Sequence, residues 1–317
     1  MKRFLYYLLL TIAVAGVAFL GFVFFPTKTR AISQPDNLTD PALIEKGRYL
    51  AVAGDCVACH SPDPAKPFAG GYPFPSPIGA FYSTNITPDP ASGIGRYSLD
   101  QFDRALRYGI RADGASLAPA MPYPSYARLT DQDVAALYAY FMHGVPPIQT
   151  DPVPNPSLRW LVTFWRKLFA PNPDKVAFDP DRYADATVAR GAYLVQRAGH
   201  CGSCHTLRAL TMQEKALDES GPAFLSGGVD LEGWIAINLR GNEAGGMGLW
   251  SAQDIVDSLK TGRNPHAAVV GPPMSLVTAH SMQHLSDEDL HAIAAYVKTL
   301  PASAGDQVGF APSDATA

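Results

Sequence analysis

The sequence has 317 residues but only four cysteines, little charge and no run of basic side chains. Four cysteines are too few for a scaffold held together by disulfides. Charged residues make up 17% of the chain, against a usual share of about 25%. The 25 basic and 29 acidic side chains leave a net charge of −4. Because nucleic-acid binding depends on clustered Lys and Arg, we expect no nucleic-acid partner.

Glycine and proline, by contrast, are abundant, with 27 and 28 residues. Together they form about 17% of the chain, above the usual share of about 12%, which indicates many loops. Hydrophobic residues make up 47% of the sequence, so a chain that is disordered throughout is excluded.

One long apolar run stands at the amino terminus. Residues 4–25 are 22 residues without a charge, preceded by Lys2 and Arg3 and followed by Pro26. A helix of this length spans about 30 Å, the thickness of a bilayer core. A signal peptide has a shorter apolar region of about 7 to 15 residues and a small-residue cleavage site. We therefore predict an uncleaved membrane anchor at residues 1–30, with a removed signal peptide as the alternative.

The body of the chain contains an internal repeat of two similar units. Its four cysteines form two Cys-x-x-Cys pairs, each followed directly by a histidine. Three blocks match between the copies in the same order: residues 46–50 with 190–194, residues 97–101 with 250–254, and residues 129–133 with 285–289. We call residues 36–147 unit one and residues 184–302 unit two.

Short polar residues mark the expected helix starts. A capping oxygen followed three residues later by Gln or Asp occurs four times, at Ser98, Thr130, Ser251 and Ser286. Helical apolar spacing follows these positions. Gly109 and Gly262 are expected to end helices, and Asp40 with Pro41 to begin another. The sequence therefore predicts an all-α fold in which a few helices are joined by long Gly/Pro loops.

Residues 148–183, between the units, are rich in proline and are predicted to be a linker. Within it, residues 158–169 form a candidate amphipathic helix with Leu158, Leu161, Trp165 and Leu168 on one face. One interpretation is that this helix packs between the units or on a partner, and the other is that it lies on a membrane surface. Residues 303–317 are predicted to form a disordered tail.

The two cysteine motifs have the spacing of covalent c-type haem attachment. They are Cys56/Cys59/His60 and Cys201/Cys204/His205. Both thiols can reach the vinyl groups on one haem edge while the next residue places its imidazole under the iron. A zinc site made from both pairs would need about 15 to 20 residues between them, whereas residues 60–200 separate these pairs. A thioredoxin-like pair needs no following histidine. We therefore predict two covalently bound haem c groups.

Each iron would need a ligand opposite its histidine. Methionine gives the Met/His ligation of electron-transfer cytochromes, whereas an open position indicates chemistry on a small molecule. Met121 lies 12 residues after Gly109, and Met274 lies 12 residues after Gly262. The predicted iron ligands are therefore His60 with Met121 and His205 with Met274.

Other histidines and methionines are expected in loops, on the surface or in the core. Ligation of the second iron by two histidines stays open as an alternative to Met274. The histidines expected at the surface or in loops are His143, His200, His266, His280, His284 and His291. Met142 and Met247 are expected to fill the core.

Several longer motifs point to one family. They are Gly47-Arg48-Tyr49-Leu50 before the first cysteine motif, residues 83–89 (STNITPD), residues 119–126 (PAMPYPSY) and residues 136–141 (ALYAYF) in unit one, and residues 200–206 (HCGSCHT), Trp250-Ser251 and residues 260–264 (KTGRN) in unit two. Over residues 40–300 the sequence closely resembles the cytochrome c subunits of membrane-bound bacterial dehydrogenases, among them the alcohol, gluconate and aldehyde dehydrogenases.

The resemblance implies two tandem cytochrome c-type domains that relay electrons and bind no organic substrate. It implies a dehydrogenase catalytic subunit as one partner and, as acceptor, a quinone, a terminal oxidase or another carrier of the respiratory chain. It also implies an inner-membrane anchor with the haem domains in the periplasm. The family typically carries three haem domains, so this chain is expected to be a two-haem form. The alternative is a dihaem peroxidase, an enzyme with one open haem.

Overall fold

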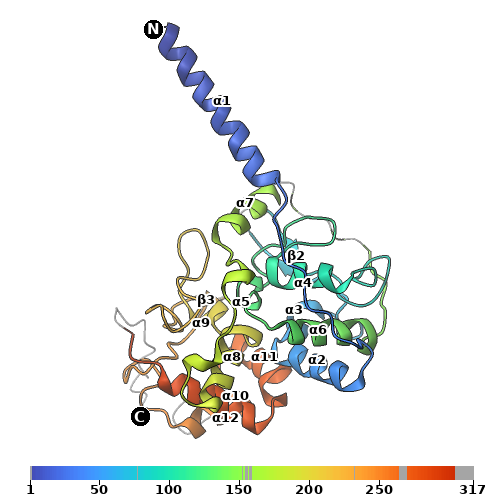
Figure 1. The fold of residues 1–317 in the computed structure, drawn as a ribbon. Helices are drawn as coiled ribbons and strands as arrows, with labels where there is room; N and C mark the ends of the chain where they lie inside the picture. Colours follow the sequence, from blue (N-terminus) through green and yellow to red (C-terminus); the bar gives the residue numbers. More distant parts are fainter. Residues whose placement is uncertain are drawn as a thin grey trace.

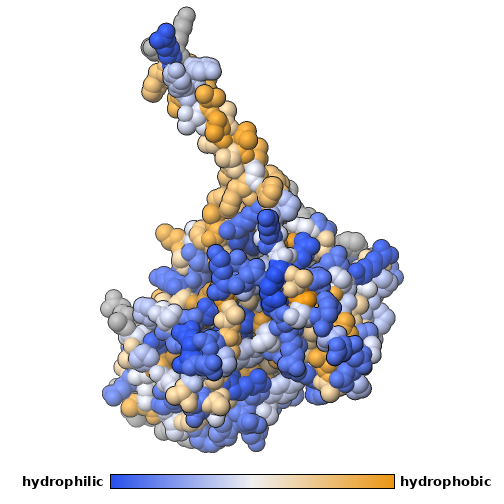
Figure 2. All heavy atoms as spheres, viewed as in Figure 1, coloured by the Kyte–Doolittle hydropathy of each residue, from blue (hydrophilic) through white to orange (hydrophobic). Residues whose placement is uncertain are grey.

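The computed structural model describes residues 2–76, 78–151, 153, 156, 159–231, 233–263 and 270–303. A single long helix, α1 (Lys2–Phe24), projects from a body that holds both units (Figure 1). The helix α7 (Arg159–Phe169) lies at the junction between α1 and the body. Within the described residues, one helix, Arg3–Phe24, has the length and composition of a membrane span. It is mostly exposed and apolar, unlike the more polar surface of the body (Figure 2).

Unit one is mainly helical. Its elements are α2 (Pro41–Ala53), α3 (Cys56–His60), α4 (Leu99–Tyr108), α5 (Tyr123–Tyr126), α6 (Asp131–Ala139) and a π-helical turn at Tyr140–Gly144, with one short hairpin of β1 (Pro73–Phe74) and β2 (Phe81–Tyr82). The two strands are antiparallel and pair Pro73 with Tyr82. Long loops join the elements, as the glycine and proline content predicts.

Unit two repeats this order. Its elements are α8 (Ala186–Tyr193), a π-helical turn at Leu194–Ala198, α9 (Gly202–His205), α10 (Ala252–Thr261), α11 (Pro272–His280), a 3₁₀ turn at Met282–His284 and α12 (Asp287–Thr299), with a hairpin of β3 (Asp230–Leu231) and β4 (Trp234–Ile235). Two further 3₁₀ turns lie in the linker, at Pro173–Lys175 and Pro180–Arg182. The predicted all-α fold of two similar units is confirmed, because the only strands in the described residues are these short hairpins.

The predicted helix starts are confirmed at all four repeat positions. The side chain of each capping residue accepts a hydrogen bond from the backbone N–H three residues on, at Ser98, Thr130, Ser251 and Ser286. Gly109 and Gly262 end α4 and α10 in the left-handed conformation, with φ of 64° and 71°. A side chain is strained at such angles, which explains why glycine stands there.

The first and last helices of each unit cross at a glycine. In unit one α2 packs on α6, and in unit two α8 packs on α12. A Cβ atom added at Gly47 would lie 1.9 Å from the carbonyl oxygen of Ala136, and one added at Gly191 would lie 1.9 Å from that of Ala292. Only glycine allows backbones to approach this closely, so the repeated Gly fixes the helix crossing in both units.

The two units meet through a reciprocal pair of tyrosines. Tyr49 of unit one donates its hydroxyl proton to Asp289 of unit two at 2.6 Å and accepts the backbone N–H of Ser286 at 3.1 Å. In the same way, Tyr193 of unit two donates to Asp133 of unit one and accepts the backbone N–H of Thr130 at 3.2 Å. Tyr49 and Tyr193 occupy equivalent places in the repeat. The units are therefore related by an approximate two-fold arrangement at their contact.

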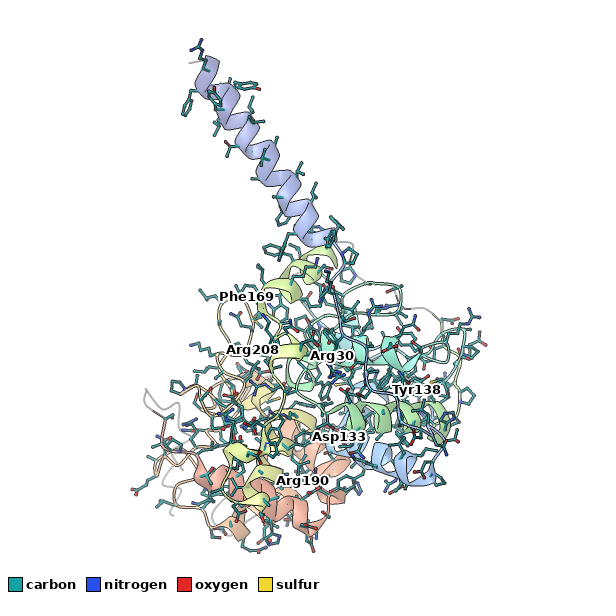
Figure 3. The ribbon with its side chains drawn as sticks, viewed as in Figure 1. Arg30, Asp133, Tyr138, Phe169, Arg190 and Arg208 are labelled. Carbon is teal, nitrogen blue, oxygen red and sulfur yellow. The ribbon has the colours of Figure 1, made fainter. Side chains whose placement is uncertain are left out.

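A basic residue beside each tyrosine completes this contact. Lys46 forms a salt bridge with Asp133 at 2.7 Å, and its repeat equivalent Arg190 holds Asp289 through two hydrogen bonds of 2.7 and 2.8 Å. Figure 3 shows Asp133 and Arg190 close to this junction. Buried apolar side chains of both units also form one continuous core. The units thus pack as one body around the sites described below.

The linker helix exists, but its buried face differs from the predicted one. In α7, Val162 and Arg166 are buried, Leu161 and Trp165 are half-buried and Leu168 is exposed. Leu158 and most of the predicted tail lie outside the described residues. The difference arises because α7 packs against two partners at once: its aromatic rings meet the end of α1, and its other side faces unit one.

Candidate haem-binding site

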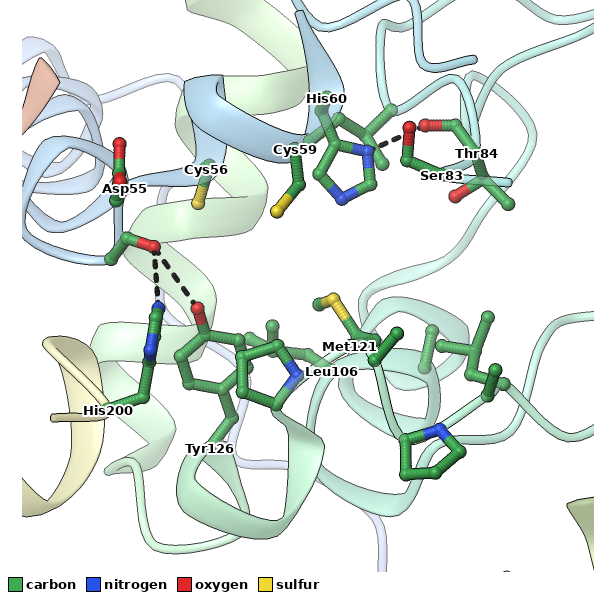
Figure 4. Close-up of a pocket in the computed structure, with 18 of the residues that line it drawn as sticks. Asp55, Cys56, Cys59, His60, Ser83, Thr84, Leu106, Met121, Tyr126 and His200 are labelled. Atoms are coloured by element: carbon green, nitrogen blue, oxygen red, sulfur yellow. Dashed lines mark hydrogen bonds between the residues drawn. The ribbon is translucent and has the colours of Figure 1, made fainter. Parts of the chain in front are cut away.

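The first cysteine motif opens onto a large cavity. The short helix α3 carries Cys56, Cys59 and His60, and all three line a cavity of about 480 Å³, a size within the range of small-molecule and cofactor sites. Met121 lines the same cavity, and Figure 4 shows its sulfur on the side opposite His60. The structure therefore brings together the four residues that the sequence singled out in unit one.

The walls of this cavity are mostly apolar. They include Phe102 and Leu106 of α4, Leu137 of α6, Phe141 of the π-helical turn and Ile94 of the loop before α4. Leu106, Phe102 and Leu137 also belong to the buried core. A flat apolar macrocycle placed here would complete the core of unit one, as the small helical content of the unit leads one to expect.

The orientation of His60 suits a metal ligand. Its Nδ1–H donates a hydrogen bond to the backbone carbonyl of Thr84 at 2.7 Å. Because a carbonyl can only accept, the proton sits on Nδ1 and the lone pair of Nε2 stays available. The side chain is 7% exposed, and burial lowers the pKa of His60. A neutral imidazole with a free Nε2 is the form that binds iron.

His205 in unit two is held in the same way. Its Nδ1–H donates to the backbone carbonyl of Ile237 at 2.8 Å, and burial lowers its pKa. The carbonyls of Thr84 and Ile237 lie in loops after each cysteine motif, a role that the sequence did not reveal. The two histidines thus share one tautomer and one kind of support.

The four cysteines are free thiols in this structure. Burial raises the pKa of Cys56 to about 12 and that of Cys59 to about 11. Burial likewise raises the pKa of Cys201 to about 12. The described residues contain no cluster of three or more His, Cys, Asp or Glu that could hold a metal ion.

The second motif is arranged differently around its methionine. Cys201 immediately precedes α9, which carries Cys204 and His205. Met274 lies near the start of α11, whereas Met121 lies before the short helix α5. A helix forms because Pro272 and Pro273 occupy its first positions, where the missing N–H groups cost nothing. The six residues 264–269, which include His266, lie outside the described residues.

The residue before each cysteine motif has an unusual backbone, and one of the two connects the motifs. Asp55 and His200 directly precede the first cysteine of each motif, and both have a left-handed backbone, with φ of 46° and 37°. His200 lines the unit-one cavity and donates its Nε2–H to the carbonyl of Gly54 at 3.2 Å, while Tyr126 donates to the same carbonyl at 3.3 Å (Figure 4). His200 was expected at the surface or in a loop; it does lie in a loop, between the π-helical turn and α9, but it is half-buried.

The cavity of unit one extends to the second motif. Cys204 and its neighbour Ser203 line it together with Cys59, and the charge of Cys204 contributes to the raised pKa of Cys59. His205 and Met274 are not among its lining residues. Cysteines of both motifs therefore line one space, which His60 also lines and His205 does not.

Comparison with known proteins identifies the family. The cytochrome c family model matches residues 44–144 and 188–301. The chain belongs to the cytochrome c family. The two matched segments fall in unit one and unit two, and both contain a Cys-x-x-Cys-His motif.

The chain is similar to several curated cytochromes. It is 51% identical to the gluconate 2-dehydrogenase cytochrome c subunit of Pantoea cypripedii over 89% of this chain and 65% of that protein. It is 50% identical to the cytochrome c subunit of the quinone-type alcohol dehydrogenase of Gluconobacter oxydans (strain 621H), over 83% of this chain and 56% of that protein. The predicted resemblance to cytochrome c subunits of bacterial dehydrogenases is confirmed.

A shorter relative matches almost end to end. The chain is 35% identical to a protein of Cereibacter sphaeroides named diheme cytochrome c-type, over 81% of this chain and 86% of that protein. By contrast, the chain spans only about three-fifths of the dehydrogenase subunits named above. These names describe electron-transfer subunits and not catalytic subunits, in agreement with the prediction from sequence.

Proposed function

We propose that this chain is a dihaem cytochrome c that passes single electrons from a dehydrogenase subunit to the respiratory chain. One observation carries the proposal: His60 and Met121 lie on opposite sides of an apolar cavity into which both thiols of the first motif open. This is the arrangement needed for a covalently attached haem with two axial ligands. The residues present therefore fit the group that the family binds.

The residues of unit one have distinct roles in this proposal. Cys56 and Cys59 would attach the haem, and His60 would offer its Nε2 while the carbonyl of Thr84 keeps its ring oriented. Met121, across the cavity, would be the second ligand and would keep small molecules out. A bound haem supplies an iron that gains and loses one electron, and a Met/His ligand pair raises its reduction potential.

Unit two is proposed to hold the second haem. Cys201 and Cys204 attach it, His205 is fixed by Ile237 for the same purpose, and Met274 is the proposed sixth ligand. Because Cys59 and Cys204 line one cavity, the attached edges of the two groups would be close. The haem in each unit would supply an iron that gains and loses one electron, and the chain would hold the two close together.

The proposed location and partners of the protein rest on α1 and on the relatives. We propose that residues 1–30 anchor the chain in the bacterial inner membrane, with units 36–147 and 184–302 on the periplasmic side and residues 148–183 as linker. The catalytic subunit of a dehydrogenase is the proposed electron donor. A quinone, a terminal oxidase or a further carrier is the proposed acceptor.

The test counts haems and identifies ligands. We expect the chain, produced in cells that attach c-type haem, to keep two haems after denaturation, measured by intact mass and by the absorbance of the pyridine complex. The reduced protein should show two low-spin centres and no fast reaction with peroxide. One haem per chain, or loss of colour on denaturation, contradicts the proposal, and peroxide turnover by a high-spin haem would favour the peroxidase alternative.

A ligand variant adds a matched comparison. Met121→Leu is expected to remove one Met-to-iron charge-transfer band and to lower the potential of that centre, because the leucine side chain offers the iron no lone pair. Met142→Leu is the control, since Met142 packs against the core and should leave both bands. An unchanged spectrum in Met121→Leu would mean that another residue ligates the iron.

A further inference from the structure

A second cavity lies where α1 meets the body. Its volume is about 400 Å³, and its lining residues come from the end of α1, the segment after it, α7, the four residues after α7 and Tyr108 of α4. Among them are the rings of Phe22 and Phe25 and the basic side chains of Lys28, Arg166 and Lys167. The cavity thus combines apolar walls with three cations, a pairing that the proposed electron transfer does not use.

The cations of α7 have no negative partner in the described part of the chain. Arg166 is buried and donates to the hydroxyls of Ser116 at 2.9 Å and Thr27 at 3.0 Å. Lys167 donates to the carbonyl oxygens of Phe22 and Phe25. These acceptors are neutral, apart from the partial negative charge at a helix carboxyl end. No salt bridge in the described residues involves Lys28, Arg166 or Lys167.

The acidic residue next to the lining in sequence is already engaged. Asp174 follows the lining residue Pro173 in sequence, but it accepts the hydroxyl proton of Tyr108 at 2.7 Å and pairs with Arg30 at 3.3 Å. Burial lowers the pKa of Arg166 and that of Lys167, which is the cost of desolvating a cation. Buried charges in proteins are normally paired, so this cavity is electrostatically suited to an anion from outside the chain.

The position of the cavity relative to the bilayer indicates which kind of anion it would meet. The apolar residues 4–25 match the thickness of a bilayer core, so Phe22 and Phe25 would lie at its outer boundary and the cations at the depth of the lipid phosphates. The same depth holds the exposed ring of Trp160, which packs on Phe19, and the exposed Leu168. Aromatic side chains and long cations are typical of this layer.

We propose that this cavity binds the headgroup phosphate of an anionic phospholipid. Lys28, Arg166 and Lys167 would face the phosphate, and Phe22 and Phe25 would contact the start of the acyl chains. The lipid would fasten α7 to α1 and so fix how the haem-binding body stands on the membrane. The inference rests on the proposed anchoring by α1.

The test uses the full-length protein with its haems attached, released from detergent and weighed intact with bound lipid. We expect the wild type to keep one phosphatidylglycerol and to bind phosphatidylcholine at least tenfold more weakly. The double variant Lys28→Gln/Lys167→Gln should bind phosphatidylglycerol about 30-fold more weakly, because each basic side chain near a lipid surface contributes about a fivefold factor. Lys66→Gln, which removes an exposed charge outside this cavity, should bind like the wild type.

Each other result overturns the inference in a recognisable way. Equal binding of the two lipids, or an unaffected double variant, means that the cations do not recognise a phosphate. Full competition by inorganic phosphate means that the site takes a free anion and that the apolar walls are irrelevant. If the intact mass shows that the first 25 or so residues have been removed, the proposed anchoring by α1 is wrong. This result is visible before any lipid is added. The haem spectrum of the double variant, unchanged from the wild type, shows that the body has kept its fold.

Discussion

Unit one and unit two cross their helices identically but build the methionine side of their sites differently. Both crossings depend on a glycine whose added Cβ would lie 1.9 Å from a carbonyl oxygen. Met121, however, lies in a turn before the one-turn helix α5, whereas Met274 lies inside the nine-residue helix α11. The backbone framework is therefore the constant part of the repeat, and the methionine loop is the part that varies.

Proline placement explains this difference. Pro122 directly follows Met121, and a residue before proline is disfavoured in the helical conformation. The helix α5 accordingly begins only at Tyr123. In unit two the prolines precede Met274 and form the first turn of α11. An equal distance from the preceding glycine therefore does not give an equal local structure, and the environments of the two proposed sixth ligands differ.

Removing one cysteine pair at a time is expected to produce the largest difference between the units. Cys56→Ala/Cys59→Ala and Cys201→Ala/Cys204→Ala are each expected to reduce covalent haem from two to one per chain, because each pair attaches only its own group. Mass spectrometry of the denatured variants measures the count. Loss of both haems in either variant would show that the units do not mature independently.

Filling the glycine crossings should give the next largest effect. Gly47→Ala and Gly191→Ala each place a methyl group against backbone that cannot move away, and we expect each to cost about 3 kcal/mol or more of unfolding free energy. Urea unfolding of the folded holoprotein measures this. Gly21→Ala is the control, since its Cβ would meet nothing within 4 Å. A small effect in only one unit would show that the two crossings differ in rigidity.

Much of the framework was predictable from local pattern. The caps at Ser98 and Ser251 and the stop at Gly109 depend on neighbours within one helix, and a sequence displays such neighbours directly. The cysteine motifs are recognisable for the same reason, because their residues are neighbours in the sequence. Met121 and His60 were predicted as one ligand pair from the chemistry of the motif, and both line one cavity; their binding of an iron stays a prediction.

The contacts between units could not be predicted in this way. Tyr49 and Asp289 are 240 positions apart, and no periodicity relates them. The left-handed residues before the cysteines were hidden because they are Asp55 and His200 instead of glycine. His200 lies in a loop, as expected, but its contacts with Tyr126 and Gly54 half-bury it, which the sequence did not show. Such placements depend on the docked units, which local pattern does not encode.

The reciprocal tyrosines allow a smaller and more exact test of the two-fold contact. Tyr193→Phe and Tyr49→Phe each remove a hydrogen bond to a buried carboxylate, and bonds to charged groups contribute about 1.5 to 3 kcal/mol. We expect Tyr193→Phe to have the larger effect, since Tyr193 is more buried than Tyr49. Urea unfolding measures both, with Tyr72→Phe as the control at an exposed position. Equal losses of unfolding free energy would show that the difference in burial between Tyr193 and Tyr49 does not change what each hydrogen bond contributes.

The smallest expected effect is the pH dependence of stability that comes from Asp289, the partner of Tyr49 at this contact. Burial opposes ionisation of Asp289, but hydrogen bonds from Arg190 and Tyr49 outweigh it and hold the pKa of Asp289 below its usual value. A carboxylate with a lowered folded-state pKa stabilises the fold above the ordinary value of about 3.9, and this contribution is lost as the pH falls through the folded-state pKa. The wild type should therefore lose unfolding free energy on acidification below about pH 4 by this route.

Asp289→Asn should remove that part of the acid sensitivity, because the amide does not titrate. The measurement is the difference in unfolding free energy between wild type and variant at pH 6, 4 and 3, and the gap is expected to narrow as the pH falls. Arg48→Gln is the control, since the pair of Arg48 with Glu45 is exposed on both sides and such pairs contribute little. A gap of constant size would mean that the carboxylate acts at this contact by its shape and hydrogen bonding, and that its charge state is the same in the folded and unfolded chain.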